Sequence, residues 1–339
     1  MNILPVPPWP LWFKISYGAN MMAGYRLLSR LALMAMALAM FSVSSLAQTS
    51  TTTGKAVFSG DRKASTFAFE WREGLIFLPV RINGSRPLSF VLDTGSTRIL
   101  IDRKLAADLG LKASGTGSLQ GAGAGRIPIE FIHDVGIALP GVESAGYDLS
   151  TADLQPLEAV DGGKVDGIIG YPFFSRFVIT VDFEAKQLTL TSPEAFHPNS
   201  AGQALPIELR NKWPFVKGEL VLPGPVTVQD SFLIDSGSSD AVDHPIVMTL
   251  QSRVPSKSGV GLGAEVQGAT ARATSFHLGR YAVEGPLVAC CGGTDATSKL
   301  IGSEILRRFT VSFDYSSSRI FITPNSYYGE GSLSPAIQP

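Results

Sequence analysis

The feature that most constrains this chain is an internal repeat in which an apolar strand ends in Asp-Thr/Ser-Gly-Ser. The first half reads Ser89-Phe-Val-Leu-Asp-Thr-Gly-Ser96, and the second half reads Ser231-Phe-Leu-Ile-Asp-Ser-Gly-Ser238. Further along, Gly167-Ile-Ile-Gly170 is matched by Lys299-Leu-Ile-Gly302. A repeat that keeps its order over several elements predicts two similar structural units joined in one chain.

Composition indicates what these units are made of. The 339 residues include 35 Gly and 22 Pro, and only 17% are charged, which favours short strands and many turns over helical bundles. Apolar residues make up 45%, enough for a sizeable core, so a disordered or collagen-like chain is excluded. We therefore expect an all-β fold.

Local patterns predict several individual elements. Asn83-Gly84, between apolar stretches at 76–82 and 87–92, predicts a β-hairpin with a type I′ turn. A helix is expected over 103–109, closed by Gly110. The Ser- and Pro-rich segment 192–203 is expected to connect the two repeated units. Further strands are expected at 127–132, 134–137, 177–183 and 187–191.

The N-terminal residues 1–47 have the order of a secretory signal peptide. Two arginines precede the apolar stretch Leu31–Phe41, and small residues follow up to Ala47, after which we expect cleavage. Translation from Met21 or Met22 would leave a signal of ordinary length. The interpretation predicts a secreted or periplasmic protein.

An uncleaved membrane anchor is the alternative for this segment. The apolar run is shorter than the roughly 18 residues that a membrane span usually needs. No stable membrane insertion is therefore expected after signal cleavage.

Charge and ligand-forming residues exclude several function classes. The net charge is −1 and basic residues form no long run, so no nucleic-acid partner is expected. The four histidines are scattered singly and match no zinc-site spacing, so we expect no metal and no cofactor.

The only cysteines are Cys290 and Cys291. Adjacent Cα atoms lie about 3.8 Å apart, closer than ordinary disulfide geometry, so buried thiols are expected.

The repeated Asp residues, Asp93 and Asp235, point to acid–base chemistry. Two carboxyl groups held within hydrogen-bond distance cannot both ionise and therefore share a proton. The ionised member can take a proton from a water molecule while the protonated member polarises a carbonyl group. Glycine two residues after each Asp lets the two loops approach closely, and the hydroxyl residue between them can donate across the pair.

With these motifs the chain resembles an aspartic peptidase in which two retropepsin-like lobes are fused in one polypeptide, similar in plan to the pepsin-type bilobal enzymes. The resemblance spans roughly residues 75–324. It implies an all-β acid protease fold with two pseudo-symmetric lobes and a cleft between them. We expect an N-terminal lobe over 48–198 and a C-terminal lobe over 199–339.

The resemblance also implies roles for single residues. Asp93 and Asp235 correspond to the catalytic pair, braced by the hydroxyls of the residues that follow them. Ile168-Ile169-Gly170 and Leu300-Ile301-Gly302 match the apolar-apolar-Gly element that supports each Asp loop from beneath. The next Ser in each half falls where the family places a side chain bonded to a catalytic carboxylate. The supporting residues are Thr94, Gly95, Ser96, Ser236, Gly237 and Ser238.

A flap that closes over substrate is expected between the Asp loop and the apolar-apolar-Gly element. The candidates are Gln120, Gly121, Ala122 and Gly123. This segment has no Tyr, unlike pepsin-type flaps, so either it works through backbone contacts as in retropepsins or closure differs. A second Gly-rich stretch at 259–263 predicts a second flap.

The sequence thus predicts an exported aspartic endopeptidase that acts on a peptide or protein substrate. A monomer is expected, because one chain supplies both carboxyl groups. The alternative is a catalytically inactive peptide-binding module with the same fold, which would hold extended chains by strand addition. Self-processing, with residues 48–74 as the substrate, is compatible with the same Asp pair.

Overall fold

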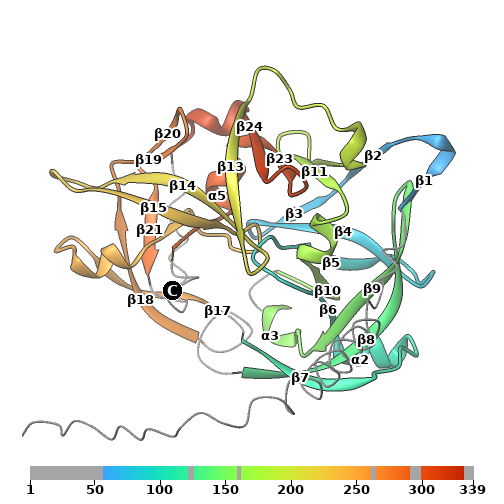
Figure 1. Cartoon of the computed structure of the whole chain (residues 1–339). Coiled ribbons are helices and arrows are strands. Elements are labelled where there is room, and N and C mark those ends of the chain that lie inside the picture. Colours follow the sequence, from blue (N-terminus) through green and yellow to red (C-terminus); the bar gives the residue numbers. More distant parts are fainter. Residues whose placement is uncertain (1–55, 121–125, 159–161, 261–264, 291–298, 332–339) are drawn as a thin grey trace, which may run out of the picture. The chain divides into compact units, whose positions relative to one another are not determined.

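The computed structural model describes residues 56–120, 126–158, 162–260, 265–290 and 299–331 (Figure 1). Strands dominate these residues and the helices are short, so the chain is mostly β, as expected. The signal segment 1–47 lies outside the described residues. The helices are α2 (Arg103–Asp108), α3 (Gln155–Glu158), α4 (Tyr171–Phe174) and α5 (Ser303–Leu306), with 3-10 turns at Ser59–Asp61, Pro193–Ala195, Pro245–Thr249 and Ser326–Gly329.

One sheet is built entirely from the first half of the chain. Among the described residues it has nine strands, in the order β1-β9-β6-β10-β5-β4-β8-β7 with β3 paired to β4. These are β1 (Val57–Phe58), β3 (Glu70–Arg72), β4 (Leu75–Ile82), β5 (Leu88–Leu92), β6 (Ile99–Asp102), β7 (Gly115–Gln120), β8 (Arg126–Leu139), β9 (Val142–Ala152) and β10 (Gly167–Ile169).

The other sheet joins strands from both halves. Its fifteen described strands run in the order β17-β18-β21-β16-β22-β15-β14-β13-β24-β23-β11-β12-β2, with β19 paired to β14 and β20. They are β2 (Ala64–Ala68), β11 (Val178–Asp182), β12 (Gln187–Thr191), β13 (Gln203–Arg210), β14 (Trp213–Val221), β15 (Thr227–Ile234), β16 (Val242–Asp243), β17 (Val254–Val260), β18 (Glu265–Arg272), β19 (Ser275–Leu278), β20 (Tyr281–Glu284), β21 (Leu287–Cys290), β22 (Leu300–Ile301), β23 (Phe309–Asp314) and β24 (Arg319–Pro324).

The predicted hairpin and the helix after it are confirmed. Strands β4 and β5 are antiparallel, and the turn between them has positive φ at Asn83 (46°) and Gly84 (76°), as a type I′ turn requires. Helix α2 begins after Asp102, whose carboxylate accepts a hydrogen bond from the Leu105 N–H at 2.9 Å. It ends before Gly110, which has φ of 70°.

The prediction of separate strands at 127–132 and 134–137 was wrong. The structure has one strand, β8, which runs through both segments and pairs with β9. The register of this pairing shifts between Ile132 and Val135, and Asp134 takes positive φ (56°). A bulge of this kind interrupts the alternation of side chains without ending the strand, which is why the sequence pattern shows a break.

The two halves share strands in the sheet to which β11 belongs (Figure 1). Strand β11 of the first half pairs antiparallel with β23 of the second, with Ile179 opposite Phe313. Between them the hydroxyls of Thr180 and Ser312 lie 2.8 Å apart. The sequence repeat predicts strands at these places but not that they pair with each other.

Each Asp loop follows a strand with the same neighbours. In the first half β5 lies between β4 and β10 and runs parallel to β10, and β10 also pairs with β6. In the second half β15 lies between β14 and β22 and runs parallel to β22, and β22 also pairs with β16. The repeat in sequence is therefore matched by a repeat in strand pairing around the two Asp loops.

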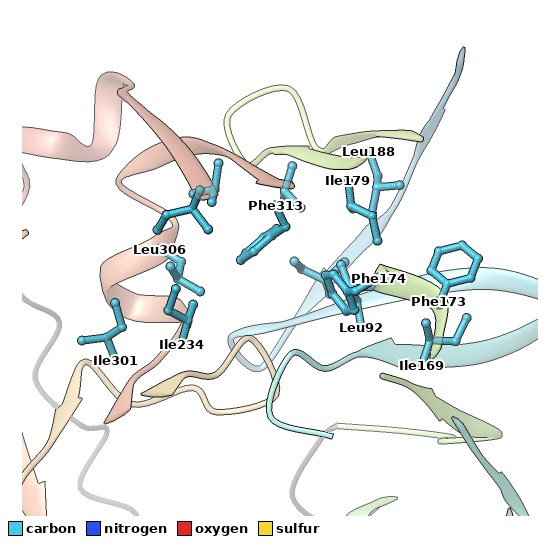
Figure 2. Close-up of a cluster of buried hydrophobic side chains, with 14 of the residues drawn as sticks. Leu92, Ile169, Phe173, Phe174, Ile179, Leu188, Ile234, Ile301, Leu306 and Phe313 are labelled. Atoms are coloured by element: carbon cyan, nitrogen blue, oxygen red, sulfur yellow. The ribbon is translucent and has the colours of Figure 1, made fainter. Parts of the chain in front are cut away.

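The main hydrophobic core includes side chains from both halves (Figure 2). Phe174 and Phe313 meet edge to face with ring centroids 5.6 Å apart. Ile234, Ile301 and Leu306 lie to one side of this pair in Figure 2, and Ile169 and Phe173 lie to the other. Packing of the strand ends before both Asp residues into one core holds the two loops at a fixed separation.

The expectation for the cysteines can be compared with the structure. Cys290 is buried and disulfide-bonded, so the prediction of a buried thiol at this position was wrong. Cys291 lies outside the described residues. Within the described residues no helix is long and apolar enough to cross a membrane. Those same residues contain no group of His, Cys, Asp or Glu that could hold a metal ion.

Candidate active site

Asp93 and Asp235 each follow directly after a central strand, β5 and β15. Their backbone N–H groups donate equivalent hydrogen bonds, Asp93 to the Ile169 carbonyl and Asp235 to the Ile301 carbonyl, both at 2.9 Å. These acceptors belong to the apolar-apolar-Gly elements that the sequence places beneath the loops. The same local sequence therefore holds both Asp residues in the same way.

The structure brings the two carboxyl groups together. They lie close enough to share a hydrogen bond. Each also accepts a hydrogen bond from its own loop: the Gly95 N–H donates to Asp93 Oδ1 at 2.7 Å, and the Gly237 N–H donates to Asp235 Oδ1 at 2.9 Å. Both Asp residues keep some solvent-accessible surface although protein atoms surround their carboxyl groups.

This environment raises the pKa of both groups above the ordinary range of Asp. For Asp93 the main cause is burial, followed by the negative charge of Asp235 and the hydrogen bond between them. Burial also raises the pKa of Asp235, while hydrogen bonds, chiefly from the Gly237 N–H and Asp93, oppose the increase. Because the groups are coupled, the pair holds one proton over a pH range in which isolated Asp would be ionised.

Four buried hydrogen bonds connect the two loops across the pair. The Thr94 hydroxyl donates to the Ile234 carbonyl at 2.7 Å and accepts from the Ser236 N–H at 2.9 Å. In the reverse direction, the Ser236 hydroxyl donates to the Leu92 carbonyl at 2.8 Å and accepts from the Thr94 N–H at 3.0 Å. Leaving one such buried partner unpaired costs about 1–3 kcal/mol, so this network strongly favours a single loop geometry.

Gly95 and Gly237 pack against the opposite carboxyl groups. A Cβ atom at Gly95 would lie 2.6 Å from the Asp235 carboxyl, and one at Gly237 would lie 2.5 Å from Asp93 Cγ. Real Cβ atoms essentially never approach other atoms so closely. The short distance between the two loops therefore requires glycine at both positions.

The serines at the next position have a different role from the one the resemblance implied. The Ser96 hydroxyl bonds to the backbone of Arg98, and the Ser238 hydroxyl accepts from the Asp240 N–H at 3.2 Å. It is their backbone N–H groups that approach Asp93 and Asp235. Each loop turns so that the serine N–H faces the carboxylate, and the serine hydroxyl therefore points toward the backbone of its own loop.

Two supporting residues were not found by sequence reasoning. Ser303, at the start of α5, donates from its N–H to the Ser238 carbonyl at 2.8 Å and from its hydroxyl to the Ser236 carbonyl at 3.1 Å. Trp213, the first residue of β14, donates its indole N–H to the Gly95 carbonyl at 2.7 Å. Ser303 occupies the position of Tyr171 in the repeat, so comparing the two halves could have identified it; no sequence signal points to Trp213.

In the first half, β7 and β8 form an antiparallel hairpin at the position predicted for the flap. Its side chains Leu119 and Ile127 pack on a small apolar cluster that includes Val91, two residues before Asp93. Gln120 ends β7 and is exposed, whereas Gly121, Ala122 and Gly123 lie outside the described residues. In the second half β17 and β18 form a hairpin at the place of the second predicted flap, with residues 261–264 likewise outside the described residues.

Comparison with known proteins agrees with this geometry. No curated protein matches the chain. Residues 78–173, which contain Asp93 and its supporting loop, match the family model described as aspartyl protease. This region is therefore similar to the aspartyl protease family, which is consistent with a retropepsin-like aspartyl protease.

Proposed function

We propose that the protein is an exported aspartic endopeptidase that hydrolyses peptide bonds with a water molecule activated between Asp93 and Asp235. The observation that carries this proposal is the contact of two carboxyl groups at the ends of equivalent strands. The aspartyl protease match in the first half supports the same reaction class.

The proposed mechanism divides two roles between the pair. The ionised carboxylate takes a proton from the water, and the resulting hydroxide attacks the peptide carbonyl carbon. The protonated carboxyl donates to the carbonyl oxygen, so the tetrahedral intermediate forms without a covalent bond to the enzyme. Collapse of the intermediate requires proton transfer to the leaving nitrogen, which the newly protonated carboxyl supplies.

The larger arrangement proposed is two pseudo-symmetric lobes, 48–198 and 199–339, each supplying one Asp. The matching strand order around β5 and β15 supports it. Because one chain provides both carboxyl groups, a monomer suffices for activity. The N-terminal segment supports export to the periplasm or the exterior, after signal cleavage at Ala47.

Cleavage of an unfolded protein mixture tests the proposed function. Purified 48–339 is incubated between about pH 3 and pH 7, with and without a statine-type inhibitor, and products are identified by mass spectrometry. We expect cleavage that is strongest at acidic pH and is abolished by the inhibitor, because one carboxyl must stay protonated. A folded protein that binds the inhibitor but cleaves nothing at any pH would instead support the peptide-binding module.

A further inference from the structure

Four paired strands carry a row of side chains beside each Asp loop, and the two rows differ at one end. In the first half the row is Phe77, Val91, Ile168 and Leu100, each directly opposite the next on a neighbouring strand. In the second half the corresponding row is Phe215, Leu233, Leu300 and Asp243. A carboxyl group thus occupies the place that leucine occupies in the first half.

These rows lie on the sheet face that leads to the carboxyl pair. Val91 is two residues before Asp93, and alternate residues of a strand share a face. Its neighbours Phe90 and Leu92 belong to the main core, whereas Val91 and Leu100 belong to the separate cluster beneath the β7–β8 hairpin. By the same alternation, Leu233 lies on the face of Asp235, and its neighbours Phe232 and Ile234 face the main core.

The surroundings of Asp243 compensate the polarity and charge of its carboxyl group poorly. Its Oδ1 atom is buried and has no hydrogen-bond partner in the described part of the chain. Burial raises the pKa of Asp243 well above the ordinary range, and the negative charges of Asp240 and Asp235 raise it further. Lys299, the residue next to Leu300, pairs with Asp230 at 2.7 Å instead. An ionised carboxyl group in such a place is costly unless a hydrogen-bond donor or a cation compensates it.

We propose that Asp243 is a specificity-determining residue that binds a cationic side chain, lysine or arginine, of the peptide substrate on the side of the second Asp loop. A cation is the chemistry that fits, because it would supply the missing hydrogen-bond donor to Asp243 Oδ1 and offset the negative charge of that carboxyl group. The equivalent place in the first half, with Leu100, would accept an apolar side chain. The proposal rests on the proposed peptidase function and names its substrate class.

A peptide panel tests this assignment. Fluorogenic peptides carry lysine or norleucine, which match in length but differ in charge, at each position within three residues of the scissile bond. For the wild type we expect kcat/KM at one position to favour lysine by about tenfold near pH 7, and by less in acid, where the raised pKa of Asp243 keeps its carboxyl group neutral. Asp243→Asn should remove this preference, and Asp243→Leu, which copies the first half, should reverse it toward norleucine.

Asp240→Asn is the matched control, because it removes a neighbouring exposed carboxylate without changing the row. Its lysine preference should stay within about twofold of that of the wild type. The proposal is overturned if Asp243→Asn keeps the wild-type preference, or if Asp240→Asn loses it equally, since a general negative potential would then explain the result.

Binding separates failure of this assignment from failure of the proposed hydrolysis. Statine-containing peptides with lysine or norleucine are not cleaved, and their dissociation constants can be measured by calorimetry. A lysine preference that disappears in Asp243→Asn would support the site even if the wild type cleaves nothing. Equal affinity for both peptides, or no binding of either, would overturn it.

Discussion

Asp93→Asn should lower kcat/KM for any cleaved peptide by at least about 10³-fold while the protein stays folded. The amide oxygen can still accept the hydrogen bond from the Gly95 N–H, so the loop keeps its anchor. What is lost is the ability of this position to hold or release a proton, on which both proposed roles depend. Steady-state kinetics and circular dichroism on the same preparation give the two readouts.

Asp182→Asn provides the control for this substitution. Asp182 caps a turn by accepting a hydrogen bond from the Ala185 N–H at 2.9 Å, and it lies outside the carboxyl pair. This variant should retain activity within about twofold. Asp93→Asn with activity close to that of the wild type would contradict the assigned role of the pair.

The same substitution should change how stability depends on pH. Because the pKa of Asp93 is raised in the folded state, the folded protein binds more protons than the unfolded chain above the ordinary Asp pKa. The free energy of unfolding of the wild type therefore falls as pH rises from that value through the raised pKa. Asp93→Asn removes this loss, so the variant should be the more stable protein near neutral pH and lose that advantage in acid.

Gly95→Ala should reduce kcat by about 10²-fold or more with the overall fold retained. The new Cβ would lie 2.6 Å from Asp235, which must move away or force the loop to shift. Either movement separates the carboxyl groups and weakens their shared hydrogen bond. Peptide kinetics and thermal denaturation would measure the loss of activity and the accompanying destabilisation.

Gly329→Ala is the matched control for this prediction. A Cβ at Gly329 meets no atom within 4 Å, and no positive φ is required there. Its kinetics should equal those of the wild type. Full activity of Gly95→Ala would show that the close approach of Gly95 to Asp235 is not needed for function.

Much of this site could be predicted from short sequence patterns because each pattern has a local physical cause. Asn83-Gly84 requires a particular turn, and Gly110 ends a helix, whatever surrounds them. The two Asp-Thr/Ser-Gly-Ser motifs predicted neighbouring carboxyl groups because the same loop occurs twice in one chain. The structure brings Asp93 and Asp235 together and shows the Thr94 and Ser236 hydroxyls donating across the pair.

Other features depend on contacts between distant segments and leave no local pattern. Trp213 reaches Gly95 across the fold, and its neighbours in sequence, Lys212 and Pro214, give no hint of this partner. The pairing of β11 with β23 likewise depends on tertiary arrangement. The hydroxyls of Ser96 and Ser238 turn to their own backbone because the amides already face the carboxylates, a choice of orientation that residue types alone do not determine.

The central claim is that Asp93 and Asp235 share one proton, and carboxyl titration by ¹³C NMR tests it most directly. In protein labelled at the Asp side-chain carboxyl carbons, the two resonances are assigned with the Asp93→Asn and Asp235→Asn variants. We predict that the pair releases its protons in two separate steps, the second well above the ordinary range of Asp, and that in either variant the remaining carboxyl group titrates in a single step below this late step. Independent titration of both carboxyl groups near the ordinary Asp pKa would contradict the account.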